Sequence, residues 1–302
     1  MVAKKRQLIK KFKSYIYKVA KYNYSIKTEK RGRPDKYKLG YYIKYITKVL
    51  CYGYTWEQLD CECDPSTIKK KFYKWRDNGI FNAAYNLLQE YYADNFDMNN
   101  LHIDSTVIAN VNCNECIGYS YKFKGKKSTK INTIVTNDKI TVSHIISKPS
   151  EHDVNFIEPC LEQVIDKVNP TYHQPLYVTG DKGYTTTEIK DKLKQKNIIL
   201  IYPHKKNTVK KKINYKHKKK LSDRFNVEVS YAYTKKRYKR IKLPTDKKIK
   251  NYNVFYMLSN IFDILIFLIK RRSFSKLNRY VDEKIQENNI KFNYDPDIHI
   301  AY

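Results

Sequence analysis

Two strand-like segments of this 302-residue chain each deliver one carboxylate after a run of apolar residues. "LHIDST" carries Asp104 and "LYVTGD" carries Asp181, while a third acid, Glu228, stands in a lysine-rich segment expected to be helical, "SDRFNVEVSYAYTKKRYKR". Hard cations such as Mg²⁺ prefer oxygen ligands, and a pair of them can drive phosphoryl transfer. Three carboxylates gathered by the fold would suit that chemistry. Any α/β domain offers acids at strand ends, however, so the spacing by itself is only suggestive.

The surroundings of Glu228 repeat at helical spacing. Arg224, Glu228, Tyr231 and Lys235 fall at i, i+4, i+7 and i+11, so they line one face of the expected helix. A glutamate between two cations could face a metal and an anionic substrate. The alternative is a set of i,i±4 salt bridges, which would stabilise the helix by only about 0.3–0.5 kcal/mol.

The charge balance indicates a polyanionic partner. Sixty Lys+Arg against thirty Asp+Glu give a formal net charge of +30, which favours nucleic acid. Abundant Lys, Ile, Asn and Tyr would also follow from AT-rich codons, so part of the lysine content has another possible source. Six cysteines form no regular framework, which suits a reducing intracellular compartment. Cys113 and Cys116 have zinc-ligand spacing without a second ligand pair, so ordinary thiols are expected.

No segment favours export or membrane insertion. "MVAKKRQLIKKFKSY" lacks the apolar core of a signal peptide. The most apolar stretch, 254–269, is short for a membrane span and contains Ser259, Asn260 and Asp263, so a buried helix is expected. We expect an intracellular, DNA-associated protein that is not secreted and has no membrane partner.

The first third of the chain is expected to be helical. Residues 1–31 read as a basic arm or a frayed helix, and residues 32–97 as a helical region. A helix ending at Gly53 and a short helix at 55–60 precede "DPSTIKKKFYKWRDNG", which carries Lys69, Lys70 and Lys74 beside an apolar face. This order is typical of a helix-turn-helix that contacts DNA. A small helical bundle with solvated lysines is the alternative.

From residue 98 to 270 the pattern changes to strands. Three consecutive strands, a helix, the strand before Asp181, a helix near 185–196 and the strand "NIILIYP" precede a polybasic linker at 204–220 and a helix from about Ser222. This order predicts an α/β fold: an RNase-H-like, mixed five-stranded sheet with flanking helices, preceded by the all-α region. Residues 271–302 are expected to form a polar tail.

With these segments in place, the chain resembles the DDE transposases of bacterial insertion sequences from about Gly32 to Leu268. "IDST", "KGKKSTKINTIV" and "SKPSEHDVNFIEPCL" resemble the segments of that family's first two strands and of its strand-to-helix passage. "GDKGY" resembles the signature around the second Asp. The final Tyr, Arg, Glu and Lys series fits at Arg224, Glu228 and Lys235, whereas Leu221 replaces the tyrosine.

The resemblance implies a DNA transposase, a metal-dependent polynucleotidyl transferase and endonuclease acting in DNA recombination. Asp104, Asp181 and Glu228 would be catalytic and would hold Mg²⁺ or Mn²⁺, expected as two ions with Asp104 bridging them. The expected DNA contacts are Lys69, Lys70, Lys74, Lys130, Lys182, Arg224, Tyr231 and Lys235. Partners would be double-stranded DNA, both element ends and target, and further copies of the chain in a homodimer or higher assembly.

Three other functions stay open at this point. A domesticated descendant would bind DNA sequence-specifically without catalysis, although all three acids are retained. A metal-dependent nuclease would cut DNA without joining it. A general packaging protein would need no divalent metal, and Asp181→Asn would leave its behaviour unchanged.

Overall fold

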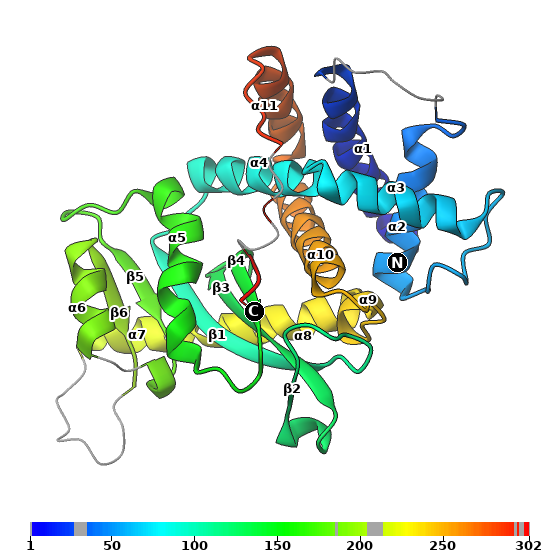
Figure 1. Cartoon of the computed structure of the whole chain (residues 1–302). Helices are drawn as coiled ribbons and strands as arrows, with labels where there is room; N and C mark the ends of the chain where they lie inside the picture. Colours follow the sequence, from blue (N-terminus) through cyan, green and yellow to red (C-terminus); the bar gives the residue numbers. More distant parts are fainter. Residues whose placement is uncertain are drawn as a thin grey trace. The chain divides into compact units, whose positions relative to one another are not determined.

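The computed structural model describes residues 2–26, 35–184, 187–203, 214–292, 295 and 299–301. Gly32 and Pro34, expected to interrupt the chain, and residues 204–213 of the expected polybasic linker lie outside these residues. The chain divides into two compact units, shown in one drawing in Figure 1. A helical unit comprises Met1–Tyr91, Arg237–Asp246 and Lys250–Pro296, and a sheet unit comprises Tyr92–Lys236, Lys247–Ile249 and Asp297–Tyr302. This division follows spatial contacts, so its limits differ from the expected domain limits, which were drawn by expected function.

The helical unit contains α1 (Val2–Ile26), α2 (Leu39–Tyr52), α3 (Pro65–Asp77), most of α4 (Ile80–Asn95), α9 (Lys239–Lys242), α10 (Ile249–Lys270) and α11 (Phe274–Gln286). α3 begins where expected, because Asp64 accepts a hydrogen bond from the Ser66 N–H at 2.7 Å and Pro65 fits the first turn. Phe72 and Trp75 of α3 are fully buried, and Phe72 stacks on Phe255 of α10 at 4.8 Å.

Three segments of this unit differ from expectation. The short helix expected at 55–60 is a pair of turns, in which the Thr55 N–H donates to the Gln58 side chain at 2.9 Å. Trp56 and Leu59 are buried without a helix. The N-terminal segment, expected as a basic arm or a frayed helix, is one continuous helix over Val2–Ile26 with Phe12 and Val19 on its buried side. The expected polar tail contains α11, which buries Leu277 and Val281.

α10 coincides with the most apolar stretch of the sequence. Among the described residues it is the one helix long and apolar enough by composition to cross a membrane. Its most apolar window is 83% buried inside the structure, and Phe262 stacks on Phe12 of α1 at 4.7 Å. Such burial is typical of a core helix, as the sequence predicts, whereas a span would face lipid.

The sheet unit contains the strands β1 (Asn100–Ala109), β2 (Gly118–Tyr119), β3 (Lys127–Thr136), β4 (Thr141–Ser147), β5 (Leu176–Thr179) and β6 (Ile198–Ile201). Their order is β4–β3–β1–β5–β6, and β2 pairs with the start of β3. β3 runs antiparallel to β1 and β4, whereas β5 and β6 run parallel to β1. The predicted RNase-H-like mixed sheet is confirmed, with the two-residue strand β2 in addition to the five expected.

Helices cover both faces of this sheet. They are α5 (Ile157–Val168), α6 (Thr187–Gln195), α7 (Tyr215–Asp223) and α8 (Phe225–Arg237), with short 3₁₀ turns at Tyr121–Phe123, Asp153–Phe156 and Lys182–Tyr184. Gln163 of α5 bonds Ser143 of β4 at 3.0 Å on one face. Val227 and Tyr231 of α8 pack on Val135 of β3 on the other. The helix expected from Ser222 to 240 is thus three helices, and it starts earlier, at Tyr215.

Candidate active site

β1 positions Asp104 in its middle, not at its end as the sequence suggested. β5 pairs with β1 only from Asn100 to His102, so the edge of β1 beyond that point has no neighbour on the β5 side. Asp104 is therefore partly open to solvent, with 21% of its side chain exposed, although residues on both sides of it belong to the strand. The Ser105 N–H holds one carboxylate oxygen at 2.8 Å.

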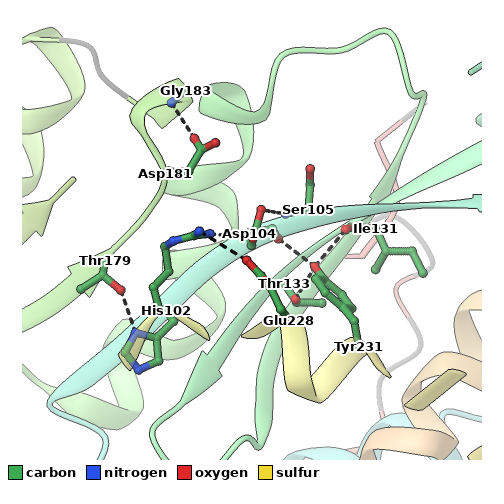
Figure 2. Close-up of polar contacts among 11 residues, drawn as sticks. His102, Asp104, Ser105, Ile131, Thr133, Thr179, Asp181, Gly183, Glu228 and Tyr231 are labelled. Atoms are coloured by element: carbon green, nitrogen blue, oxygen red, sulfur yellow. Dashed lines mark hydrogen bonds and ion pairs between the residues drawn. The ribbon is translucent and has the colours of Figure 1, made fainter. Parts of the chain in front are cut away.

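The segment "GDKGY" fixes Asp181 immediately after β5. A Cβ on Gly180 would lie 2.9 Å from the buried ring of Tyr184, so only glycine fits between that ring and Ile103. The Gly183 N–H donates to Asp181 Oδ1 at 2.5 Å (Figure 2). A Cβ on Gly183 would lie 2.8 Å from the same oxygen. Both glycines of the signature therefore serve the placement of this carboxylate.

Arg224 joins the first carboxylate to the third. It lies at the break between α7 and α8, where Nη1 contacts Asp104 Oδ2 at 2.9 Å and Nη2 contacts Glu228 Oε1 at 3.3 Å. Glu228 lies in the first turn of α8, where the helix dipole favours a negative charge. One guanidinium thus brings Asp104 of β1 together with Glu228 of α8. The i,i+4 salt bridge considered from the sequence exists, and it is shared with Asp104.

Tyr231 ties α8 to β1 and β3 beneath the site. Its hydroxyl donates to the Asp104 carbonyl, the oxygens lying 2.8 Å apart, and accepts from Thr133 Oγ1 at 2.6 Å (Figure 2). Two turns of helix separate Arg224 from Tyr231, so both side chains reach the same strand. The helical spacing seen in the sequence therefore corresponds to one face lying against β1 and β3.

The three carboxylates influence one another electrostatically. Burial raises the pKa of Asp104, and the negative charges of Asp181 and Glu228 raise it further. The Ser105 N–H and the Arg224 guanidinium act in the opposite direction without reversing the shift. In the view of Figure 2, Asp104 lies between Asp181 and Glu228. Arg224 therefore joins Asp104 to Glu228, whereas Asp181 influences Asp104 through its charge.

Their oxygen atoms form a donor set suited to a hard divalent cation. Burial is the main cause of the raised pKa of Asp104, and the repulsion from Asp181 and Glu228 that adds to it is what a bound cation would relieve. In the described part of the chain, no three His, Cys, Asp or Glu side chains approach one another closely enough to hold a metal ion as they stand. Arg224 instead supplies the positive charge between Asp104 and Glu228. The chemistry of the donors fits a metal, and its binding would require side-chain movement.

The expected DNA-contacting residues differ in availability. Lys182 is exposed beside Asp181, and Lys70 and Lys74 are exposed on α3, while Lys69 lies 3.7 Å from Glu57. Lys235 donates to Thr106 Oγ1 at 2.7 Å, and burial, with the charge of Lys122, lowers its pKa to about 8.

Two other expected contacts are buried. Lys130 bonds Asp153 at 2.8 Å and is 6% exposed, and Tyr231 is 8% exposed. Neither side chain is presented to a phosphate in this structure.

One feature near the site was not foreseen. His102 lies two residues before Asp104 on the same face, and its ring nitrogens contact Thr179 Oγ1 and Asn137 Oδ1, each at 2.7 Å. Burial lowers its pKa, so it joins β1 to the end of β5 as a neutral ring. Cys113 and Cys116 are buried thiols, and burial raises the pKa of Cys116 to about 12. That supports the expectation of ordinary reduced cysteines.

Comparisons with known proteins show one family match. The family model described as "Transposase DDE domain" matches residues 97–277, more than half of the chain. No curated protein sequence matches. Among solved structures, "Crystal structure of the Mos1 mariner paired end complex with Mn" is 12% identical, covering 88% of this chain and 83% of that one at a TM-score of 0.33. "Crystal structure of a pre-cleavage Mos1 transpososome" is 12% identical, covering 89% and 84%, also at 0.33.

A TM-score of 0.33 is too low to support an inference about function. The family match stands without it. It spans Asp104, Asp181 and Glu228, together with the helices and strands that position them. This chain belongs to the transposase DDE domain family.

Proposed function

We propose that this protein is an active transposase that cuts and joins DNA strands by phosphoryl transfer at Asp104, Asp181 and Glu228, with Mg²⁺ or Mn²⁺ as cofactor. The observation that carries the proposal is the link from Asp104 through Arg224 to Glu228 at 2.9 and 3.3 Å, with Asp181 close enough to raise the pKa of Asp104. Acids whose only role was to be solvated at the surface would not be expected to lie near one another, because like charges repel and a chain of net charge +30 offers many cations to pair with.

The reaction needs two successive displacements at phosphorus. Water attacks a phosphodiester at the element end, the bond from phosphorus to the 3′ oxygen breaks, and a free 3′-hydroxyl remains. That hydroxyl then attacks a target phosphodiester and releases a target 3′-hydroxyl. Bound divalent cations supply nucleophile activation and stabilisation of the leaving oxygen in such reactions. Asp104, Asp181 and Glu228 would hold them.

The cationic side chains around these acids would hold the DNA. Lys182 is exposed next to Asp181, and Arg224 lies between Asp104 and Glu228, so each could pair with a phosphate near the scissile bond. Lys235 is anchored to Thr106, on the same face of β1 as Asp104. Lys70 and Lys74 of α3 are exposed as a DNA-reading helix would need. The partner is double-stranded DNA, bound by two or more copies of the chain inside the cell.

The test is a strand-cleavage and joining assay with labelled duplexes taken from the DNA that flanks the gene on each side, where terminal repeats would lie. Mg²⁺, Mn²⁺ and EDTA are compared, with a supercoiled plasmid as target. Metal-dependent nicking followed by covalent joining to the plasmid is the expected result. Nicking without joining would indicate a nuclease, and binding without nicking a DNA-binding descendant.

Glu188 supplies a matched control for Glu228. Each lies in the first turn of its helix and in an i,i+4 ion pair, Glu188 with Lys192 at 3.0 Å and Glu228 with Arg224 at 3.3 Å. Glu228→Gln is expected to lower the rate of cleavage at least 100-fold, whereas Glu188→Gln leaves it within about twofold. Equal activity of the two variants would remove Glu228 from the proposed site.

A further inference from the structure

Between β1 and β3 the chain forms a projection that the proposed reaction does not use. Residues 118–127, here called the tyrosine arm, comprise β2, the 3₁₀ turn Tyr121–Phe123 and the start of β3. Tyr119 is 73% and Tyr121 104% exposed, so two large aromatic side chains lie two residues apart in solvent on one projection. Figure 1 shows β2 below α8, at the end of the sheet. An aromatic pair held in solvent indicates a binding surface.

The arm is rigid enough to present these rings. Ser128 Oγ donates to the Gly118 carbonyl at 3.1 Å where the arm leaves the sheet. At the tip, the Phe123 and Gly125 N–H groups both donate to the Ser120 carbonyl, at 3.0 and 3.3 Å, and Gly125 adopts a φ of +73° that suits glycine. A ring on such a turn loses little conformational freedom when it binds a partner, so less of the binding free energy is lost to ordering.

The charges of the arm select an anionic partner. It contains four lysines and no acid, and all four are exposed: Lys122, Lys124, Lys126 and Lys127. Lys122 lies close enough to Lys235 to lower its pKa, and Lys235 is bonded to Thr106 on the face of β1 that carries Asp104. The positive charge of the arm therefore continues toward the candidate active site within the same unit.

The strand register gives the separation of Asp104 from the base of the arm. Ala109 of β1 pairs with Ser128, which also pairs with Gly118 at the base of the arm. Five residues of strand separate Asp104 from Ala109, a distance of about 17 Å at roughly 3.3 Å per residue. At about 3.4 Å per nucleotide along a strand, this corresponds to roughly five nucleotides.

We propose that the tyrosine arm binds unpaired bases of the DNA strand that lies at the active site, with Tyr119 and Tyr121 stacking on the bases and the lysines pairing with the adjacent phosphates. The inference rests on the proposed function in taking DNA as the substrate. Tyrosine rings stack on any base because every base has a π-face, while paired bases inside a duplex are inaccessible. The arm would thus favour DNA whose strands have separated about five nucleotides from the reacting phosphate.

Binding is measured with the full chain in EDTA, so that no cleavage occurs. Two probes are compared, a fully paired duplex and the same duplex with an unpaired 3′ extension carrying 2-aminopurine at successive positions. Variants Tyr119→Ala and Tyr121→Ala are compared with Tyr172→Ala, which removes a tyrosine of the same unit that is 84% exposed but lies outside the arm. Because all three side chains are exposed, the variants are expected to fold, which their melting temperatures check.

Each arm variant is expected to bind the extended probe roughly 5- to 150-fold more weakly, with the duplex changed less than about threefold. Quenching of 2-aminopurine fluorescence is expected to be strongest when the base lies about five nucleotides from the phosphate at the active site. The quenching is expected to vanish in Tyr121→Ala. Lys122→Gln is expected to reduce the slope of log K against log salt by about 0.7 on the single strand. Tyr172→Ala is expected to bind both probes as the unaltered chain does.

Two results would overturn the inference. One is a loss of DNA affinity that is as large in Tyr172→Ala as in the arm variants, or as large on paired as on unpaired DNA. The other is a change of oligomeric state in Tyr121→Ala without a change in DNA affinity, which would make the arm a contact between copies. These outcomes are independent of the proposed reaction. If Tyr121 stacks on 2-aminopurine but the chain neither cuts nor joins DNA, the inference about the arm stands and the proposed transposase activity is refuted.

Discussion

Replacing Gly183 by alanine tests whether Asp181 is positioned for catalysis. The added methyl group would lie 2.8 Å from Asp181 Oδ1, and ordinary contacts begin at 3.4 Å, so the carboxylate must move by about 0.6 Å. Gly183 has no positive φ, so the backbone itself accepts alanine without strain. The substitution therefore displaces one oxygen ligand and leaves its chemistry unchanged.

The expected consequences for activity and stability differ in size. Catalytic groups must be held within about 0.5 Å, and an error of 1 Å costs roughly 100-fold, so cleavage is expected to fall roughly 10- to 100-fold. The displaced atom ends an exposed, flexible side chain, so the free energy of unfolding should change by less than about 0.5 kcal/mol. At roughly 2–4 °C per kcal/mol, the melting temperature should move by about 2 °C or less.

The assay pairs initial rates of strand nicking in Mg²⁺ with melting temperatures for two companion variants. Gly180→Ala places its methyl group 2.9 Å from the buried Tyr184 ring and 3.3 Å from Ile103. Overpacking of this kind costs about 1–3 kcal/mol, or roughly 2–12 °C, together with activity. Gly40→Ala, in α2 with nothing within 4 Å of its Cβ, is expected to stabilise the chain by about 0.5–1 kcal/mol at unchanged activity.

One outcome contradicts this reasoning directly. Suppose that Gly183→Ala cuts DNA at the rate of the unaltered chain while Gly180→Ala is destabilised as expected. The description of the local packing would then be confirmed, and the catalytic role of Asp181 would be refuted. If Gly183→Ala loses several degrees of melting temperature, its loss of activity would report unfolding instead of a displaced ligand. Rescue of cleavage by Mn²⁺, which accepts a wider range of ligand geometry than Mg²⁺, would support the displacement.

Three further results are expected. Tyr231→Phe removes a hydroxyl that contacts Thr133 and the Asp104 carbonyl, so the free energy of unfolding should fall by about 1–3 kcal/mol in denaturant titrations, and a value near zero would contradict the network. The unfolded chain keeps its Lys235 proton up to about pH 10.5 and the folded chain only to about 8; stability should therefore rise with pH between these values, and Lys235→Gln should remove that rise. Millimolar Mg²⁺ should raise the melting temperature of the unaltered chain, because the ion binds preferentially to the folded state. It should not raise the melting temperature of Asp181→Asn, and equal rises in both chains would argue against a metal at Asp181.

The sequence predicted the sheet well because its strands carry their own signals. β3 and β4 are short β-branched runs joined by a turn at Asn137–Asp138, and β5 and β6 are buried parallel strands separated by a helix. Each of these features depends on residues close together in the chain. α1 was harder to predict, because its lysines obscure an apolar face that becomes visible when Phe12, Tyr15 and Val19 are seen buried.

The position of Asp104 within β1 could not be predicted for a different reason. Nothing in "LHIDST" says where the neighbouring strand will stop, and it is the four-residue length of β5 that opens the edge beside Asp104. The break of α7 and α8 at Arg224 is likewise tertiary, because the segment has no proline or glycine to end a helix. Sequence spacing singled out the candidate side chains, whereas the fold determined which of them meet.

Each carboxylate of the site has a local donor, and two of the three donors were absent from the sequence argument. The Ser105 N–H holds Asp104 at 2.8 Å, the Gly183 N–H holds Asp181 at 2.5 Å, and the Arg224 guanidinium holds Glu228 at 3.3 Å. Two of these donors are backbone groups, which cannot move away without unfolding their segments. Only Arg224 is a side chain, and it is shared with Asp104. Entry of a cation would therefore be accommodated chiefly by Arg224, whose release would leave a guanidinium free to pair with the phosphate that the cation brings to the site.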